Sequence, residues 1–209
     1  MAYESVDAHE GEGRAQWESA GSPVLPSLAV DGVVTPILHV SQIAGALGLP
    51  SPQGDDATRL AWELLSTLDR WLALIRPLSL EQLIAPTESR GRSIRNLTVN
   101  VCHPIELLPD AWETGFFPWD PEGDDEREAS LASSDDVIRY AEVTAGHWTG
   151  FLLASGEDLS GRDPLVTSPR GAVAYSELLA SQAFHATFHL RQIEVACSHR
   201  GNRGSFGPR

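Results

Sequence analysis

Apolar residues recur at helical spacing in several long stretches of this chain, and this pattern limits its fold more than any other feature. The clearest stretch carries apolar side chains at Leu60, Leu64, Leu68, Trp71, Leu72 and Ile75. This spacing puts one apolar stripe along a helix, and the stripe has to be buried against other helices. Asp55 or Asp56 is expected to cap the helix at its start, and Pro77 to end it.

Three further stretches follow the same rule. The second predicted helix begins near Ser93, carries Ile94, Leu97, Val101, Ile105 and Leu108, and should kink at Pro104. The third is expected over 135–154 and the fourth over 176–198, with a short helical turn over 79–84. Long loops are expected at 112–134 and 155–171. Four long helices with such connections predict a mainly α protein built as a four-helix bundle.

The first fifty residues have a different character. Residues 1–22 are polar and without periodicity, which predicts a flexible tail. Within 23–50, Asp31-Gly32 is a hairpin turn signal between two β-prone runs, and a short helix is expected from Ser41, its N-cap, to Gly48. This hairpin and helix are too small to fold alone. They should pack on the bundle at 55–199 or on a second copy, giving a homodimer through the exposed ribbon edge.

Charge and composition exclude several classes of function. The chain has 209 residues, with 15 Lys+Arg against 29 Asp+Glu and a formal net charge of −14. This balance argues against binding to nucleic acid or to an anionic membrane. No apolar run reaches the roughly 18–20 residues of a spanning helix, and the N-terminus lacks the pattern of a signal peptide. We therefore expect a cytoplasmic protein, in which the isolated Cys102 and Cys197 are small buried hydrophobic residues. A flexible tail is expected over 200–209.

His185 and His189 are the strongest candidate functional residues. They lie four residues apart on the fourth predicted helix, so both imidazoles project from one face. Phe184 and Phe188 flank them, which predicts a core or pocket setting. Two imidazoles placed in this way can hold one divalent metal ion. The alternative is a pair of core histidines satisfied by backbone or carboxylate groups.

A catalytic metal ion usually takes three protein ligands. His103, beside Pro104, is the best third candidate, or else a partly exposed helix histidine. Asn100 lies one turn earlier and could bond water or a substrate carbonyl. There are three further candidates. Glu106 is either a carboxylate that supports an imidazole or one that faces solvent, and Gln192 either orients a ligand or caps the bundle. His147 is expected to be structural or exposed.

The run from Arg92 to His103, followed by His185-x-x-x-His189-x-x-Gln192, resembles the DinB superfamily, which includes mycothiol-dependent maleylpyruvate isomerases and bacillithiol S-transferases. The resemblance covers about 55–199 and implies a four-helix bundle with a three-histidine metal site. The family's second-helix histidine, seven residues after its serine, falls on Asn100 here. Either His103 replaces it as ligand, or only His185 and His189 remain and the metal binds weakly.

The hairpin and helix at 23–50 look like the last hairpin and helix of a glutaredoxin. In that fold the proline corresponding to Pro26 is cis and flanks a thiol-binding groove. No Cys-x-x-Cys motif accompanies it, so dithiol redox chemistry is not expected. The piece is then a packing remnant or half of a thiol-recognition surface.

Together these patterns predict a metal-dependent S-transferase or isomerase that joins a low-molecular-weight thiol of the mycothiol type to a small electrophile. His103, His185 and His189 would hold the divalent metal, zinc first and nickel or iron as alternatives, while Asn100 orients substrate or water. Two other readings stay open: a non-catalytic bundle that binds a small molecule or a partner, and a metal-dependent hydrolase. Trp112 and Trp119 are expected either to cover the site as lids or to plug the bundle end.

Overall fold

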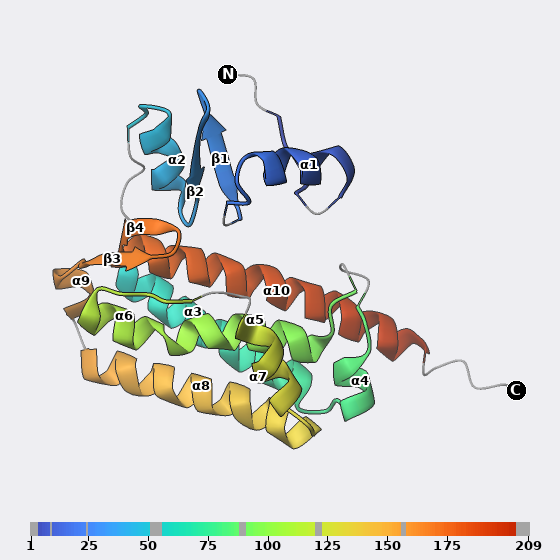
Figure 1. Ribbon diagram of the computed structural model, residues 1–209. Coiled ribbons are helices and arrows are strands. Elements are labelled where there is room, and N and C mark those ends of the chain that lie inside the picture. Colours follow the sequence, from blue (N-terminus) through green and yellow to red (C-terminus); the bar gives the residue numbers. More distant parts are fainter. Residues whose placement is uncertain are drawn as a thin grey trace, which may run out of the picture.

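The computed structural model describes residues 4–8, 10–23, 25–50, 56–87, 91–119, 123–155 and 158–203. Four long helices dominate it, as Figure 1 shows: α3 (Ala57–Ile75), α5 (Ile94–Glu106), α8 (Ser134–Ser155) and α10 (Tyr175–Arg203). Asp56 and Ser93 cap α3 and α5, each accepting a backbone N–H with its side chain. The predicted fold class, a mainly α four-helix bundle with a short N-terminal hairpin and helix, is confirmed.

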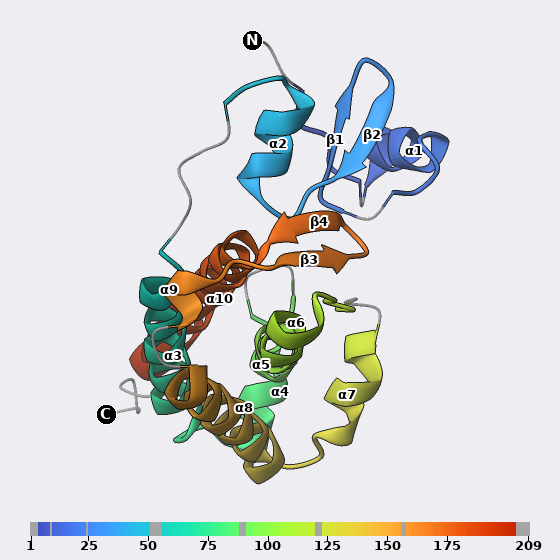
Figure 2. The same cartoon turned by 90° about the vertical axis from the view of Figure 1, so that its left-hand side faces the viewer.

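Each long helix packs against two others, so the bundle closes on itself. Helix α3 contacts α8 and α10, and α5 contacts the same two helices, an arrangement that is clearest in Figure 2. Buried tryptophans fill the middle while keeping their indole N–H groups bonded. Nε1 of Trp71 lies 3.1 Å from Oγ1 of Thr98, and Nε1 of Trp148 lies 3.0 Å from the carbonyl oxygen of Ala61. These bonds avoid the cost of an unsatisfied buried donor.

The second long helix is shorter than its apolar pattern predicts. Helix α5 ends at Glu106, and a separate helix, α6 (Leu108–Thr114), begins after Leu107. Pro104 lies in the last turn of α5, so it marks the end of the helix where we expected a kink within it. A proline lacks the N–H of a helical hydrogen bond and crowds the preceding turn. The helical path is therefore interrupted just beyond His103, between α5 and α6.

The two long connections contain structure that the sequence analysis missed. The first holds the end of α6 and α7 (Asp124–Ser130), and the second holds α9 (Asp158–Gly161) and strand β3 (Leu165–Ser168). Strand β3 pairs antiparallel with β4 (Gly171–Ala174). The short helix α4 (Leu80–Ile84) forms where expected. Ser168-Pro169-Arg170-Gly171 was a readable turn signal between two short apolar runs.

The N-terminal hairpin and helix form as predicted. Strands β1 (Ser27–Val30) and β2 (Val33–Pro36) pair antiparallel, α2 (Val40–Ala46) follows, and the Leu25–Pro26 peptide bond is cis. The sequence predicts Ser41 as the N-cap of α2, but the N-cap in the structure is His39. The segment expected to be a tail also contains a helix, α1 (Gly11–Ser19), which buries none of its residues. Such a helix has no apolar stripe, so periodicity does not reveal it.

We call β1, β2 and α2 the N-terminal unit. Figures 1 and 2 show it lying over the β3–β4 hairpin and the start of α10. Gln42 on α2 donates from Nε2 to the backbone oxygen of Arg170 over 2.9 Å. Nδ1 of His39 lies 3.7 Å from a carboxylate oxygen of Glu177. The unit thus packs on the bundle, one of the two arrangements that the sequence predicts. Among the described residues, no helix is long and apolar enough to cross a membrane.

Candidate functional site

His185 and His189 lie one turn apart on α10 with their rings close together. The ring centroids are 4.6 Å apart and the planes meet nearly edge to face, at 80°. His189 is buried, with 6% of its surface exposed, and His185 is half-buried. The prediction that the two imidazoles share one helix face is confirmed.

Each imidazole has an amide oxygen as partner. Nε2 of His185 lies 3.0 Å from Oδ1 of Asn100, and Nδ1 of His189 lies 2.7 Å from Oε1 of Gln192. An amide oxygen only accepts, so these two ring nitrogens carry the hydrogen in the arrangement described. The other nitrogens, Nδ1 of His185 and Nε2 of His189, then carry lone pairs. Gln192 therefore orients its histidine, one of the two roles expected for it.

Both histidines are held in the neutral form. Burial, followed by the nearby His189, Arg92 and Arg170, lowers the pKa of His185 from 6.5 to about 3. Burial also lowers the pKa of His189, against the opposing effect of its bond to Gln192. Neutral imidazole is the form that binds metal ions.

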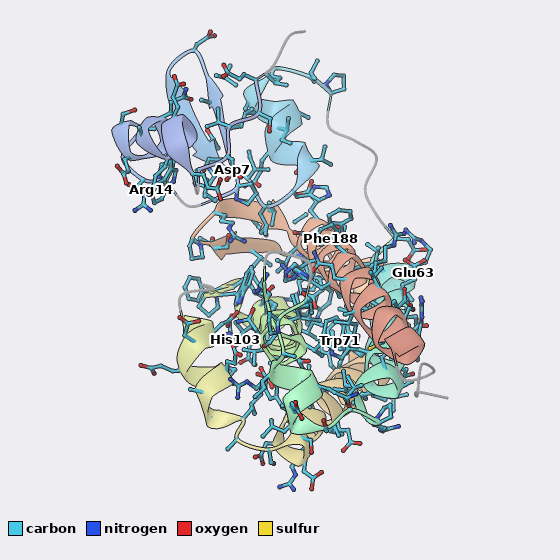
Figure 3. All side chains as sticks on the ribbon, turned by 90° about the vertical axis from the view of Figure 1, so that its right-hand side faces the viewer. Asp7, Arg14, Glu63, Trp71, His103 and Phe188 are labelled. Carbon is cyan, nitrogen blue, oxygen red and sulfur yellow. The ribbon has the colours of Figure 1, made fainter. Side chains whose placement is uncertain are left out.

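Asp124, the first residue of α7, ties Asn100 to His103. One carboxylate oxygen accepts from Nδ2 of Asn100 over 3.3 Å, and the other lies 2.7 Å from Nδ1 of His103. Only 4% of the surface of Asp124 is exposed. The carboxylate thereby fixes which end of the Asn100 amide faces His185. Figure 3 places His103 on the side of α5 that faces α7.

The described residues do not bring the predicted ligands His103, His185 and His189 into one group. The part of the chain that the structure describes contains no group of three or more His, Cys, Asp or Glu side chains arranged to hold a metal ion. His103 is directed to Asp124 and does not join the histidine pair. Asn100, at the position where the DinB pattern carries its histidine, is the α5 residue that reaches His185. Whether the pair binds a metal ion stays a prediction.

The donors present nevertheless suit a divalent cation. They are two neutral imidazoles and one amide oxygen, and imidazole suits zinc, iron and nickel. Nε2 of His185 and Oδ1 of Asn100 are 3.0 Å apart, which equals the separation of two adjacent ligands at about 2.1 Å from one ion at a right angle. A neutral imidazole can carry its hydrogen on either nitrogen, so binding through Nε2 requires no loss of a proton from His185.

Trp119 covers His185 on a second side. The two ring centroids lie 5.7 Å apart, and the guanidinium carbon of Arg170 lies 5.0 Å from the centroid of the indole. Trp112, by contrast, is buried against Tyr175, with ring centroids 4.9 Å apart. Trp112 is therefore a core residue, in line with the second of its two expected roles, whereas Trp119 is part of the site.

Of the two phenylalanines predicted to line the site, Phe188 borders it, with its ring centroid 5.4 Å from that of His189. Phe184 is 73% exposed and Phe188 is 49% exposed, and their rings pack on each other with centroids 6.3 Å apart. Figure 3 shows Phe188 on the outer side of α10. Residues next to a buried helix position lie about 100° around the helix axis from it, so sequence neighbours of the histidines face outward.

Of the remaining candidates, Glu106 and Cys197 have surroundings other than those expected, whereas His147 and Cys102 lie as predicted. Glu106 accepts from the hydroxyls of Tyr140 and Thr144 at 3.1 Å each, and supports no histidine. His147 is exposed, one of its two expected placements. Cys102 is buried and its pKa is raised to about 12, chiefly by burial, so its thiol stays protonated and unreactive. Cys197 is half-buried.

Two residues of the site were missed by sequence reasoning. Asp124 lay in an acidic run that reads as solvated surface, and Arg170 lay in a segment taken for a loop. The turn signal at Pro169-Arg170-Gly171 could have placed Arg170 at a hairpin tip. Nothing in the local sequence distinguishes Asp124 from the neighbouring acidic residues.

A separate pocket of about 310 Å³ lies near the start of α10, lined in part by Asp163 and Ser176.

The architecture defines a class of protein, the four-helix bundle that presents a histidine pair from its last helix. A solved structure that is similar to this chain is YfiT from Bacillus subtilis, described as a probable metal-dependent hydrolase with an unusual four-helix bundle topology. The TM-score is 0.54 with 14% sequence identity, over 68% of this chain and 86% of that chain. Similarity at this identity establishes a shared fold. Neither a protein family nor a curated protein matches the chain at the sequence level.

Proposed function

We propose that this protein is a metal-dependent enzyme of the DinB type that transfers a low-molecular-weight thiol to a small electrophile, as a transferase or isomerase. The observation that carries the proposal is the oriented histidine pair. His185 and His189 share one face of α10, and the amide oxygen of Gln192 fixes the ring of His189 through Nδ1. Metal-binding histidines in proteins have such a partner on the ring nitrogen that faces away from the ion.

The proposed ligands are His185, His189 and, in place of the predicted His103, the amide oxygen of Asn100. Asp124 supports this assignment because it accepts from Nδ2 of Asn100 and turns Oδ1 toward the histidines. An amide oxygen is a weaker donor for zinc than imidazole. We therefore expect weaker zinc binding than a three-histidine site would have.

A bound divalent cation would supply the charge that lowers the pKa of a thiol or water beside it. The residues of this chain supply the surroundings. Trp119 and the burial of His189 limit access of water, which strengthens electrostatic interactions in the site.

A metal-dependent hydrolase is the second candidate. It is favoured by the fold shared with YfiT, which is described as a probable metal-dependent hydrolase. The same donors would then serve an attacking water in place of a thiol. The two candidates differ in one requirement, because only the transferase consumes thiol.

Metal analysis of the full chain purified without an affinity tag is the first test. We expect about one equivalent of zinc, nickel or iron in the wild type, and its loss in His185→Ala and His189→Ala. His147→Ala is the matched control, since His147 is an exposed histidine on α8 and should leave the metal content unchanged. Wild-type protein that binds no divalent metal would favour the non-catalytic bundle.

A thiol-consumption assay then separates the candidates. Wild-type protein loaded with metal is mixed with a thiol and a maleyl or quinone electrophile, and free thiol is followed with time. Metal-dependent loss of thiol supports the transferase. Release of acid from an ester or amide without any thiol supports the hydrolase.

A further inference from the structure

We propose that the site beside the histidine pair contains an anion-binding subsite formed by Arg170 and the indole N–H of Trp119, so that one substrate carries a carboxylate or a comparable anionic group. That the anion belongs to a substrate rests on the proposed function. Binding of an anion at this subsite does not require that function.

The indole N–H of Trp119 is a buried donor without an acceptor in the part of the chain that the structure describes. Trp119 is only 9% exposed, and its Nε1 has no hydrogen-bond partner among the described residues. Trp71 and Trp148, the buried tryptophans of the bundle centre, both donate to an oxygen. A buried donor without an acceptor is costly, and an anionic ligand oxygen would remove that cost.

Arg170 brings a positive charge to the same place. Its guanidinium carbon lies 5.0 Å from the centroid of the Trp119 ring, and this ring lies 5.7 Å from that of His185. The guanidinium group binds carboxylates with paired hydrogen bonds. Arg170 and the proposed metal ligand His185 thus both lie beside the Trp119 ring.

The position of Arg170 depends on the N-terminal unit. Nε2 of Gln42 donates to the backbone oxygen of Arg170 over 2.9 Å, and Gly171 beside it adopts a left-handed φ of 99°. The hairpin tip is therefore held between α2 and the indole of Trp119. This contact gives the N-terminal unit a positioning role at the bundle site.

Calorimetric titration of the metal-free full chain with succinate tests the subsite, with succinamide as the uncharged probe. Metal-free protein is used because a carboxylate also binds metal ions directly. We expect succinate to bind and succinamide not to bind. Arg170→Gln and Trp119→Phe should each weaken succinate binding by about tenfold, the size expected for a lost hydrogen bond to a charged group. Equal binding of both probes would overturn the proposal.

Arg162→Gln is the matched control. The guanidinium carbon of Arg162 also lies 5.0 Å from a tryptophan ring centroid, that of Trp112, which is buried against Tyr175. We expect this variant to bind succinate as the wild type does. Equal weakening by Arg162→Gln and Arg170→Gln would overturn the proposal, because it would point to a general charge effect. Trp119→Phe keeps an aromatic ring in the site, so it tests the N–H if Arg170→Gln should fail to fold.

The two proposals can fail separately. Succinate binding that depends on Arg170 in a protein without metal affinity supports the subsite and rejects the metal enzyme. If thiol is consumed, a pair of thiols identifies which substrate carries the anion. A higher KM of Arg170→Gln for 3-mercaptopropionate, but not for 2-mercaptoethanol, assigns the anion to the thiol. An unchanged KM for both, with a higher KM for a carboxylate electrophile, assigns it to the electrophile.

Discussion

Oδ1 of Asn100 lies 3.0 Å from Nε2 of His185, which joins the second and last long helices at the centre of the site. The amide stands where the DinB pattern carries a histidine. Replacing it should therefore change metal affinity more than it changes the fold. We expect Asn100→His to raise zinc affinity by about tenfold or more, and Asn100→Ala to lower it by a similar factor, as found when supporting contacts of metal ligands are lost.

Zinc titration of metal-free protein by calorimetry measures both effects, with circular dichroism as a check of folding. Asn96→Ala is the control, since Asn96 lies on the same helix and bonds Arg92 and Glu128 instead of a histidine. If Asn100→His and Asn100→Ala bind zinc equally well, Asn100 is not a ligand.

Asp124→Asn should destabilise the bundle. Asn offers one acceptor oxygen where the carboxylate offers two, so either Asn100 or His103 loses its acceptor. For a site that is 4% exposed, we expect the free energy of unfolding to fall by about 1–3 kcal/mol. Urea denaturation measures it. Asp125→Asn, at the exposed neighbouring position, should leave it within about 0.5 kcal/mol.

The stability of the metal-free protein should decrease as the pH falls below about 6.5. The unfolded chain binds a proton at His185 with the ordinary pKa of 6.5, while burial lowers the folded value to about 3. Between these values the unfolded state binds more protons, so stability is greatest above pH 6.5 and is lost toward pH 3. His185→Gln should flatten this slope by up to about 1.4 kcal/mol per pH unit.

Urea unfolding at several pH values from 4.5 to 7.5 tests this expectation. His147→Gln removes an exposed histidine and should reproduce the wild-type profile. Parallel profiles for the wild type and His185→Gln would mean that His185 titrates normally in the folded protein.

Gln42→Ala should loosen the β3–β4 hairpin. The variant loses the bond from α2 to the backbone oxygen of Arg170, so amide hydrogens at 165–174 should exchange faster with solvent. Gln82→Ala is a matched control, because both glutamines close a capping box at the start of a short helix. Hydrogen exchange followed by mass spectrometry distinguishes them. Similar protection of the hairpin in all three proteins would show that Gln42 does not hold it.

Deletion of residues 1–50 tests whether the N-terminal unit mediates a homodimer. Strands β1 and β2 form a two-stranded ribbon whose outer edges can pair with another copy. We expect light scattering to give a dimer mass for the full chain and a monomer mass for the shortened one, with a lower melting temperature. The same mass and melting temperature for both would make the unit a passive appendage.

The sequence by itself determined the four long helices, because an apolar stripe such as Leu60, Leu64 and Leu68 leaves a helix no stable alternative to burial. It likewise determined the shared face of His185 and His189, since four residues make about one turn. These are local consequences of backbone geometry. The hairpin at Asp31-Gly32 followed from turn chemistry in the same way.

Only the tertiary structure decided which α5 residue reaches the histidine pair. Asn100 and His103 lie three residues apart, on nearly the same face, and the sequence favoured His103. Asp124, from a helix that periodicity did not reveal, bonds both residues, and Asn100 is the one that lies within hydrogen-bonding distance of His185. Long-range contacts of this kind depend on how α5, α7 and α10 pack together, and no local pattern in any one helix encodes them.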